Sequence, residues 1–299
     1  MFRSVLVGFD ASDQSRDALA LAQSLTDADG RLVVCCVHPP DPPLGEPIPP
    51  GLSMAVQARE RLNVARSELD DPRATYVARG GPSAGEGLQL EAERRHCDLI
   101  VVGSSHRGTI GRIFPGSVTR QVLQAAPCAV AVAPRGLHQA PPPAPRTIGV
   151  GYDASAQARA ALQTAADMAR RSGAAVEVIA VVDIVSDFGG WAAAWSYEEV
   201  LRAARSAAQA RVDGAVGALQ DVSARGSVLE GSAIEQLVAA TGQLDLLVVG
   251  SRNYGPLRRA LLGSVSGRVA EQAHCPVIVV PHSASDAQEA AVTAVGAEA

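Results

Sequence analysis

One stretch of thirty-seven residues occurs twice in this chain, and it constrains the fold more than any other feature. Asp98 to Pro134 aligns without a gap with Asp245 to Pro281, and seventeen of the thirty-seven positions are identical. Shared composition alone would not hold the register across the strand, polar loop, helix and second strand that each copy predicts. The chain therefore contains two copies of one structural unit, and its 299 residues suffice for two domains of roughly 100 to 200 residues.

Apolar runs and amphipathic helices alternate along both halves of the sequence. The pattern predicts five strands in each half, the first at its start and the last at its end. The strands are apolar on both faces, which is typical of a parallel sheet covered by helices. Such alternation predicts βαβ units with right-handed crossovers. We therefore expect an α/β fold of two tandem domains, each a five-stranded parallel sheet with helices on both faces.

Proline-rich and polar segments set the expected domain bounds. The stretch HQAPPPAPR separates the two halves and predicts a short, extended linker, because proline stiffens the backbone. The residues beyond His282 show no apolar period and predict a tail. The expected organisation is domain 1 at 1–137, the linker at 138–146, domain 2 at 147–282 and the tail at 283–299.

A glycine-rich loop lies inside each copy of the repeat. The first strand ends at Gly103 or Gly250, a basic loop follows, and a Gly-Ser pair then opens a helix. Glycine lets the backbone approach a ligand closely, and the free N–H groups and dipole of a helix start favour an anion. This arrangement predicts a phosphate site in each half. The alternative is that Ser117 and Ser264 are ordinary helix N-caps.

The spacing within these loops resembles the nucleotide-binding signature of the universal stress protein family, in which Gly, two residues, Gly, nine residues and Gly-Ser/Thr follow one another. Here the pattern is Gly103-x-x-His106-x9-Gly116-Ser117 and Gly250-x-x-Asn253-x9-Gly263-Ser264. The resemblance covers nearly the whole chain and looks like the tandem, UspA-like form of the family. It implies Rossmann-like (adenine nucleotide alpha-hydrolase-like) domains that bind ATP.

Both copies depart from the signature at its second glycine. Asn253 can adopt the left-handed conformation at modest cost, whereas His106 is less suited to it. The second half is therefore the better candidate for an occupied site. Arg107 and Arg112 of the first loop, like Arg252 and Arg258 of the second, are expected to be free to meet phosphate.

The resemblance also implies which residues contact the nucleotide. Asp10 and Asp153 follow the first strand of each half and are expected at the ribose, although helix capping is an alternative role. The backbone near Val37 and Val181 is expected to meet the adenine. Magnesium, where present, would be held by the phosphates, and no protein metal site or catalytic residue is expected. The full set of expected ATP-binding residues is Asp10, Val37, Gly103, Gly116, Ser117, Val118, Thr119, Asp153, Val181, Gly250, Arg252, Gly263, Ser264, Val265 and Ser266.

Composition excludes several other classes of function. The net charge of -5, and aromatic residues that are not interleaved with arginine, argue against a nucleic-acid partner. No apolar run reaches the roughly 18 residues of a membrane span, and the start of the chain lacks a signal-peptide core. The five cysteines show no Cys-x-x-Cys spacing and predict small buried hydrophobic residues. We expect a cytoplasmic location.

The expected function is ATP binding as a regulatory or structural ligand in a stress response, without catalysis. The signature loops contain no lysine, and no carboxylate or glutamine that could orient a water on a γ-phosphate. Two alternatives stay open, namely a nucleotide-free interaction scaffold of the same fold and a weak ATP-hydrolysing enzyme. The last strands of the halves, 129–133 and 276–280, are expected at sheet edges, where they could pair the two domains as a pseudo-dimer. Homodimerisation is left open.

Overall fold

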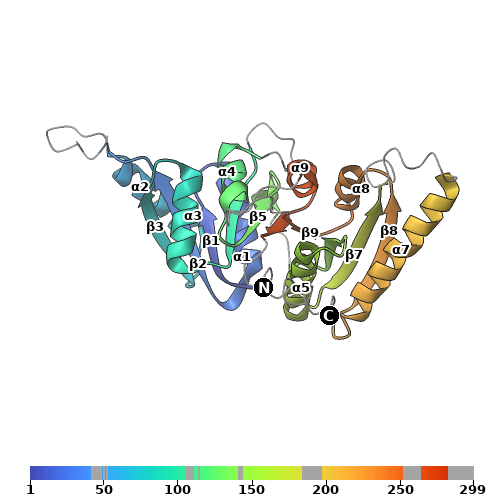
Figure 1. Ribbon diagram of the computed structural model, residues 1–299. Helices are drawn as coiled ribbons and strands as arrows, with labels where there is room; N and C mark the ends of the chain where they lie inside the picture. Colours follow the sequence, from blue (N-terminus) through green and yellow to red (C-terminus); the bar gives the residue numbers. More distant parts are fainter. Residues whose placement is uncertain are drawn as a thin grey trace, which may run out of the picture. The chain divides into compact units, whose positions relative to one another are not determined.

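A computed structural model describes residues 1–41, 49, 51, 53–105, 111–113, 115–140, 144–183, 197–251 and 264–281 of the chain. The chain forms two compact units that divide between Ala144 and Pro145. Each unit is described by itself below, and Figure 1 labels their helices and strands. Of Tyr197 and Ser264 only the helical backbone is described.

Unit 1 is a doubly wound α/β unit. Its elements are β1 (Phe2–Gly8), α1 (Asp13–Leu25), β2 (Thr26–His38), α2 (Met54–Glu68), β3 (Ala74–Gly80), α3 (Ala84–Arg95), β4 (Leu99–Gly103), α4 (Ser117–Ala125), β5 (Ala129–Ala133) and the short 3-10 helix η2 (Leu137–Gln139). The strands lie in the order β3-β2-β1-β4-β5 and are parallel. The strand order reverses between β1 and β4, so their carboxyl ends border the crevice where such sheets bind ligands.

The helices of unit 1 cover both faces of the sheet. α3 packs against α4, while α1 packs on β1 and β4, and α2 on β2 and β3. Right-handed crossovers place α1 and α2 on one face and α3 and α4 on the other. The central strands are fully buried, as Val5, Leu6 and Ile100 show. The continuous apolar character of these strands follows from this cover on both sides.

Unit 2 repeats this arrangement. Its elements are β6 (Thr147–Gly151), α5 (Ala156–Ser172), β7 (Ala175–Val182), α7 (Tyr197–Gly217), β8 (Ala224–Glu230), α8 (Ala233–Ala240), β9 (Leu246–Gly250), α9 (Ser264–Gln272) and β10 (Val277–Val280). The order β8-β7-β6-β9-β10 is that of unit 1, and the strands are again parallel. The predicted α/β class with two parallel five-stranded sheets is confirmed.

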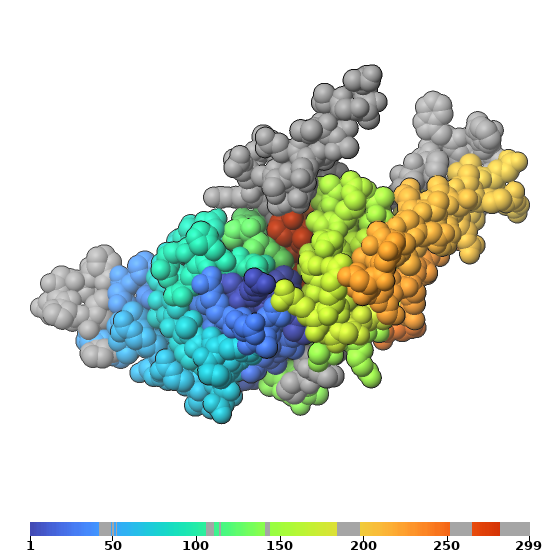
Figure 2. Space-filling view, turned by 90° about the horizontal axis from the view of Figure 1, so that it is seen from below, coloured from blue at the N-terminus to red at the C-terminus, as the bar shows by residue number. Residues whose placement is uncertain are grey.

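α7 is amphipathic and lies at the surface of unit 2. Only one side of it is buried, through Ala208, Val212 and Ala215. In Figure 2 its yellow and orange residues are visible along the helix. Among the described residues, no helix combines the length and apolar character that crossing a bilayer requires. The cytoplasmic location stays a prediction.

A buried carboxylate ties the end of unit 1 to α1. Asp17 is fully buried, and its two oxygens accept the backbone N–H groups of Gly136 at 2.8 Å and His138 at 2.9 Å. The Nδ1 atom of His138 lies 2.5 Å from the same carboxylate. Gly136 has φ of 87°, a left-handed conformation that favours glycine. The first residues of the expected linker are therefore fixed to unit 1, while residues 141–143 lie outside the described part.

The same segment also contacts the signature loop. The Gly111 N–H donates to the Arg135 carbonyl at 2.8 Å, and the Arg135 N–H donates to the Arg112 carbonyl at 3.2 Å. When Asp10 is aligned with Asp153, Asp17 corresponds to Ala160. Unit 2 thus lacks this carboxylate, so the anchor belongs to the unit that leads into the linker.

We expect Asp17→Ala to lower the free energy of unfolding of unit 1 by about 1–3 kcal/mol, because the substitution leaves buried N–H donors without an acceptor. Chemical denaturation measures the loss, and hydrogen exchange at the Gly136 and His138 amides locates it.

The matched control is Asp13→Ala, one turn earlier on the same helix. The Asp13 side chain is 70% exposed and pairs only loosely with Arg16, at 3.4 Å. Exposed pairs contribute about 0–1 kcal/mol, so a small loss is expected. Equal losses in the two variants would show that Asp17 does not anchor the segment.

Candidate functional site

A cavity of about 620 Å³ opens at the carboxyl ends of β1 and β4 in unit 1. Its walls come from the turn between β1 and α1, the end of β2, the start of α3, the end of β4 and the start of α4. This volume lies within the range of small-molecule sites. The cavity brings together all seven of the expected unit 1 residues, which are Asp10, Val37, Gly103, Gly116, Ser117, Val118 and Thr119.

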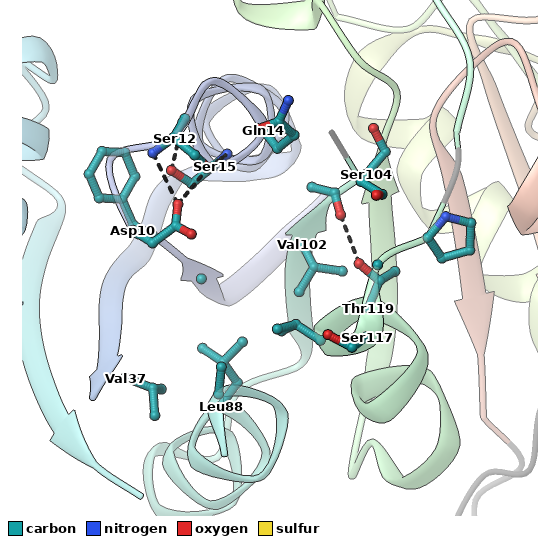
Figure 3. A pocket seen from close by; sticks show the side chains of 18 of the residues that line it. Asp10, Ser12, Gln14, Ser15, Val37, Leu88, Val102, Ser104, Ser117 and Thr119 are labelled. Atoms are coloured by element: carbon teal, nitrogen blue, oxygen red, sulfur yellow. Dashed lines mark hydrogen bonds between the residues drawn. The ribbon is translucent and has the colours of Figure 1, made fainter. Parts of the chain in front are cut away.

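Asp10 is held at the cavity by a tight turn. Its Oδ1 accepts the Ser12 backbone N–H at 3.0 Å and the Ser12 hydroxyl at 2.5 Å. Ser12 in turn caps α1 by accepting the Ser15 N–H. Ala11 between them has φ of 67°, a strained conformation for a residue with a side chain. Figure 3 shows the other Asp10 oxygen directed into the pocket, so the turn orients a carboxylate as well as capping the helix.

Hydrogen bonds keep the Asp10 carboxylate ionised. Burial of the carboxyl group raises its pKa, but the hydrogen bonds from the Ser12 side chain and backbone outweigh burial and hold the pKa below its ordinary value. The residue as a whole is exposed at the rim of the cavity. Asp10 therefore offers an acceptor for ligand hydroxyl groups at neutral pH.

α4 begins without a side-chain cap. In α1, α2 and α3 of the same unit, a serine hydroxyl caps the helix start. The N-cap of α4 is Gly116, and Ser117 is the first helical residue, with an exposed side chain. The alternative that Ser117 is an ordinary N-cap is therefore wrong. The first-turn N–H groups of α4 are left to interact with solvent or a ligand at the cavity wall.

Arg120 adds a positive charge at this end of the cavity. It lines the pocket, and one guanidinium nitrogen donates to the Pro115 carbonyl at 3.2 Å. Sequence reasoning did not single it out, because it lies inside the helix rather than in the signature loop. Arg112 is exposed and does not line the cavity, and Arg107 lies outside the described residues.

The three described site glycines differ in whether the protein itself requires glycine at that position. A Cβ added to Gly103 would overlap the backbone carbonyl of Gln14, and one added to Gly250 would lie 2.5 Å from that of Gln157. The packing of a helix by itself requires glycine at these two positions. The expected close approach of a ligand to them stays a prediction. Gly116 has φ of -77°, and an added Cβ would come no closer than 3.8 Å to Ser105. Neither backbone conformation nor protein packing requires glycine at Gly116.

Thr119 ties α4 to the end of β4. Its hydroxyl donates to the Gly103 carbonyl at 2.8 Å, and the residue is buried. The hydroxyl hydrogen is thus used within the protein. Thr119 lines the cavity as expected, but its side chain fixes the distance between two walls of the site.

An apolar wall lies at the other end of the cavity. Val37 at the end of β2 and Leu88 of α3 line it, as Figure 3 shows. A Cβ added to Gly87 would lie 2.5 Å from the Val37 side chain, so this glycine lets α3 approach Val37 closely. The cavity therefore has an apolar end, an acidic side and an end that favours anions.

Gln14 and Ser104 line the cavity and were not expected from the sequence. Gln14 is 7% exposed and Ser104 is 6% exposed. The Gln14 Oε1 and the Ser104 Oγ are buried and make no hydrogen bond within the part of the chain that the structure describes. A signal was present, because Gln157 and Ser251 occupy the same positions in the second half. The expectation that glutamine is absent concerned the signature loops alone, and it did not consider α1.

A sequence model of the universal stress protein family matches residues 1–134 and again residues 145–281. The chain belongs to the universal stress protein family.

Relatives and solved structures agree with this assignment. A universal stress protein of Mycobacterium tuberculosis is 34% identical over 191 residues, which cover 62% of this chain and 62% of that protein. Another, from Mycolicibacterium smegmatis, is 28% identical over 290 residues and covers 92% of this chain and 96% of the relative. The crystal structure of a universal stress protein from Archaeoglobus fulgidus matches with a TM-score of 0.65 at 18% identity, over 94% of this chain and 99% of that one. The similarity to the Archaeoglobus fulgidus structure shows that the two chains share a fold.

The second universal stress protein unit keeps the Asp turn and the helix contact. Asp153 accepts the Ser155 N–H at 3.0 Å, and Ala154 has φ of 63°. Val181 lies half-buried near the end of β7. Val265 and Ser266 lie in the first turn of α9, where the buried Ser266 hydroxyl has no hydrogen-bond partner among the residues that the structure describes.

Several expectations fall on residues that the structure does not describe. Arg252, Asn253, Arg258 and Gly263 lie outside the described residues, as does His106 of unit 1. Only the backbone of Ser264 is described. The expected advantage of the second half as an occupied site therefore stays a prediction.

We expect Gly103→Ala to destabilise the protein by about 1–3 kcal/mol or more, because the added methyl group overlaps the Gln14 carbonyl and must displace α1. Gly116→Ala is expected to leave stability within about 0.5 kcal/mol of the wild type, since its backbone conformation suits alanine and the space is open. Urea denaturation of the ligand-free protein measures both. A larger loss for Gly116→Ala would refute this assignment of the two glycines.

Proposed function

We propose that unit 1 binds an adenine nucleotide, ATP, as a regulatory or structural ligand. The observation that carries the proposal is the uncapped start of α4, where a glycine that the fold does not require faces a cavity shared with Asp10 and Val37. Free N–H donors at a helix start favour phosphate. A glycine at that point lets a phosphate approach the backbone closely.

The three parts of the cavity match the three parts of a nucleotide. The apolar wall of Val37 and Leu88 suits the adenine ring. The ionised Asp10 carboxylate suits the ribose hydroxyl groups, which donate to it. The phosphates then reach the start of α4, where Ser117 and Arg120 add a hydroxyl and a guanidinium. The chain contains no lysine, so arginine must supply the positive side chains.

Magnesium would enter this site with the phosphates. In the part of the chain that the structure describes, no group of three His, Cys, Asp or Glu side chains could hold a metal ion. Mg²⁺ usually keeps several waters and is bound through substrate phosphates together with one or two protein oxygens. The proposal therefore assigns no metal site to the protein itself.

Bound ATP would act on this protein by mass action. A ligand that binds only the native state stabilises it by about 2.7 kcal/mol when its concentration is 100 times the dissociation constant. The stability of unit 1 would then depend on the concentration of ATP. Pairing of the two units through β5 and β10, and homodimerisation, are parts of the proposal that an intact-chain cross-linking experiment can test.

We expect ATP with magnesium to raise the melting temperature of the intact chain, and Gly116→Ala to bind ATP at least about tenfold more weakly, since the methyl group occupies the space that a phosphate needs. Isothermal titration calorimetry measures the affinity. Absorbance near 260 nm after purification, with mass spectrometry, identifies any retained nucleotide.

Gly214→Ala is the matched control for this test. Gly214 lies in α7 of unit 2, and an added Cβ meets nothing within 4 Å. Its affinity for ATP should equal that of the wild type. A wild-type chain that neither retains nor binds nucleotide would instead support the alternative of an interaction scaffold.

We also expect any ATP hydrolysis to be far slower than the usual catalytic range of about 1 to 1000 per second. Asp10 is assigned to the ribose end, and no described carboxylate lines the α4 end of the cavity to take a proton from a water. Gln14 also lines the cavity, but its amide can hold a water and cannot act as a base. Phosphate release from protein free of contaminating ATPases measures the rate. Turnover within that range, abolished by Asp10→Ala, would show that the chain is an enzyme.

A further inference from the structure

Two buried polar groups at the cavity have no hydrogen-bond partner among the described residues. The Gln14 Oε1 and the Ser104 Oγ are both enclosed and both lack a hydrogen bond. Buried polar atoms in folded proteins nearly always have a partner, which is protein, water or ligand. Because both residues line the cavity, a molecule held there can supply the partner that the described residues do not.

The fold places these two residues at the same end of the cavity. Gln14 lies in the first turn of α1, whose backbone packs directly on Gly103, and Ser104 is the next residue after Gly103. Ser105 is in turn the residue nearest to an added Cβ at Gly116, at 3.8 Å. Figure 3 shows Gln14 and Ser104 across the pocket from Val37 and Leu88. They therefore lie beyond the start of α4, on the side away from the apolar wall.

The second half repeats both residues. Gln157 packs its carbonyl on Gly250, and Ser251 follows that glycine. Ser251 is fully buried, and its hydroxyl again has no hydrogen-bond partner within the described part of the chain. Neighbouring positions differ between the halves, since Asp17 corresponds to Ala160. The Gln and Ser pair therefore occurs in both units. The packing of a helix on the glycine does not by itself require these two side chains.

We propose that Gln14 and Ser104 form a subsite that binds the terminal phosphate of a nucleoside triphosphate through a shared water. The Gln14 Oε1 is an acceptor and cannot bind a phosphate oxygen directly, because phosphate oxygens are acceptors too. One water can donate one hydrogen to Gln14 and the other to the phosphate, while accepting the Ser104 hydroxyl hydrogen. The subsite makes the cavity selective for ATP over AMP, and it rests on the proposed function.

The α4 contacts and this subsite act on different parts of the ligand. The N–H groups of Ser117 and Val118, in the first turn of α4, are expected to meet the α-phosphate that AMP and ATP share, so Gly116→Ala should weaken the binding of both nucleotides. Gln14 and Ser104 are expected to contact only the terminal phosphate of ATP, which AMP lacks. Loss of the subsite should therefore change the ratio of the two affinities and leave AMP almost unaffected.

The test uses calorimetric titrations of the intact chain with ATP, ADP and AMP. Gln14→Leu and Ser104→Ala are each expected to weaken ATP binding about five- to tenfold, as the loss of one or two hydrogen bonds does, and AMP binding less than twofold. Gln163→Leu is the control, since Gln163 is exposed on α5 and pairs only with Asp167. It should leave all three affinities unchanged.

Stability of the ligand-free variants gives a second, independent readout. Removing a buried group that has no protein partner should leave the melting temperature unchanged or raise it. A clear fall in melting temperature for Ser104→Ala would mean that its hydroxyl has a structural role, and it would overturn the subsite.

The outcomes also separate this inference from the proposed function. Equal losses for ATP and AMP, or no loss for ATP, overturn the subsite while nucleotide binding stands. A wild-type chain that binds none of the three nucleotides overturns the proposed function, and the subsite with it.

Discussion

The close approach of α1 to the end of β4 is the contact on which the rest of the site depends. Gly103 has no side chain, so the Gln14 carbonyl can lie against its backbone. This contact sets the position of the first turn of α1, and with it the Asp10 turn. Thr119 then fixes α4 to the carbonyl of the same glycine. One glycine thus holds both helix starts that face the cavity, and Gly250 repeats the contact with α5 in unit 2.

An uncapped helix start is stable in water but leaves its donors available. The other helices of unit 1 use Ser12, Ser53 and Ser83 to satisfy these groups, whereas α4 begins at Gly116 without a side-chain acceptor. The difference within one unit leaves the α4 donors available to an anion, which supports the proposed phosphate contact. Arg120, in the same first turns of α4, strengthens the preference for negative charge. The chemistry of the site is therefore set mainly by backbone groups.

The anchor at Asp17 shows how duplicated units diverge. Unit 1 must pass the chain on to a linker, and its buried carboxylate holds Gly136 and His138 at that point. Unit 2 has Ala160 at the same helix position. The anchored segment also pairs with the signature loop through Arg135. α1 thus contacts the cavity through Gln14 and the end of the unit through Asp17, three residues later on the same helix.

The sequence by itself determined the duplication, the α/β class, the parallel sheets and the loops that carry the site, because these follow from local apolar periodicity and from glycine spacing. It also placed Asp10 and Gly116 at strand and helix ends, which border the same crevice in a doubly wound sheet. Only the tertiary structure decided that Gly103 serves helix packing and that Ser117 is not a cap. It also brought Gln14, Ser104 and Arg120 into the cavity. The packing of Gln14 on Gly103 and the lining of the cavity bring together residues far apart in the sequence, which no local pattern encodes. The exact start of α4 at Ser117 likewise does not follow from residue type, because serine is common both as an N-cap and in the first turn.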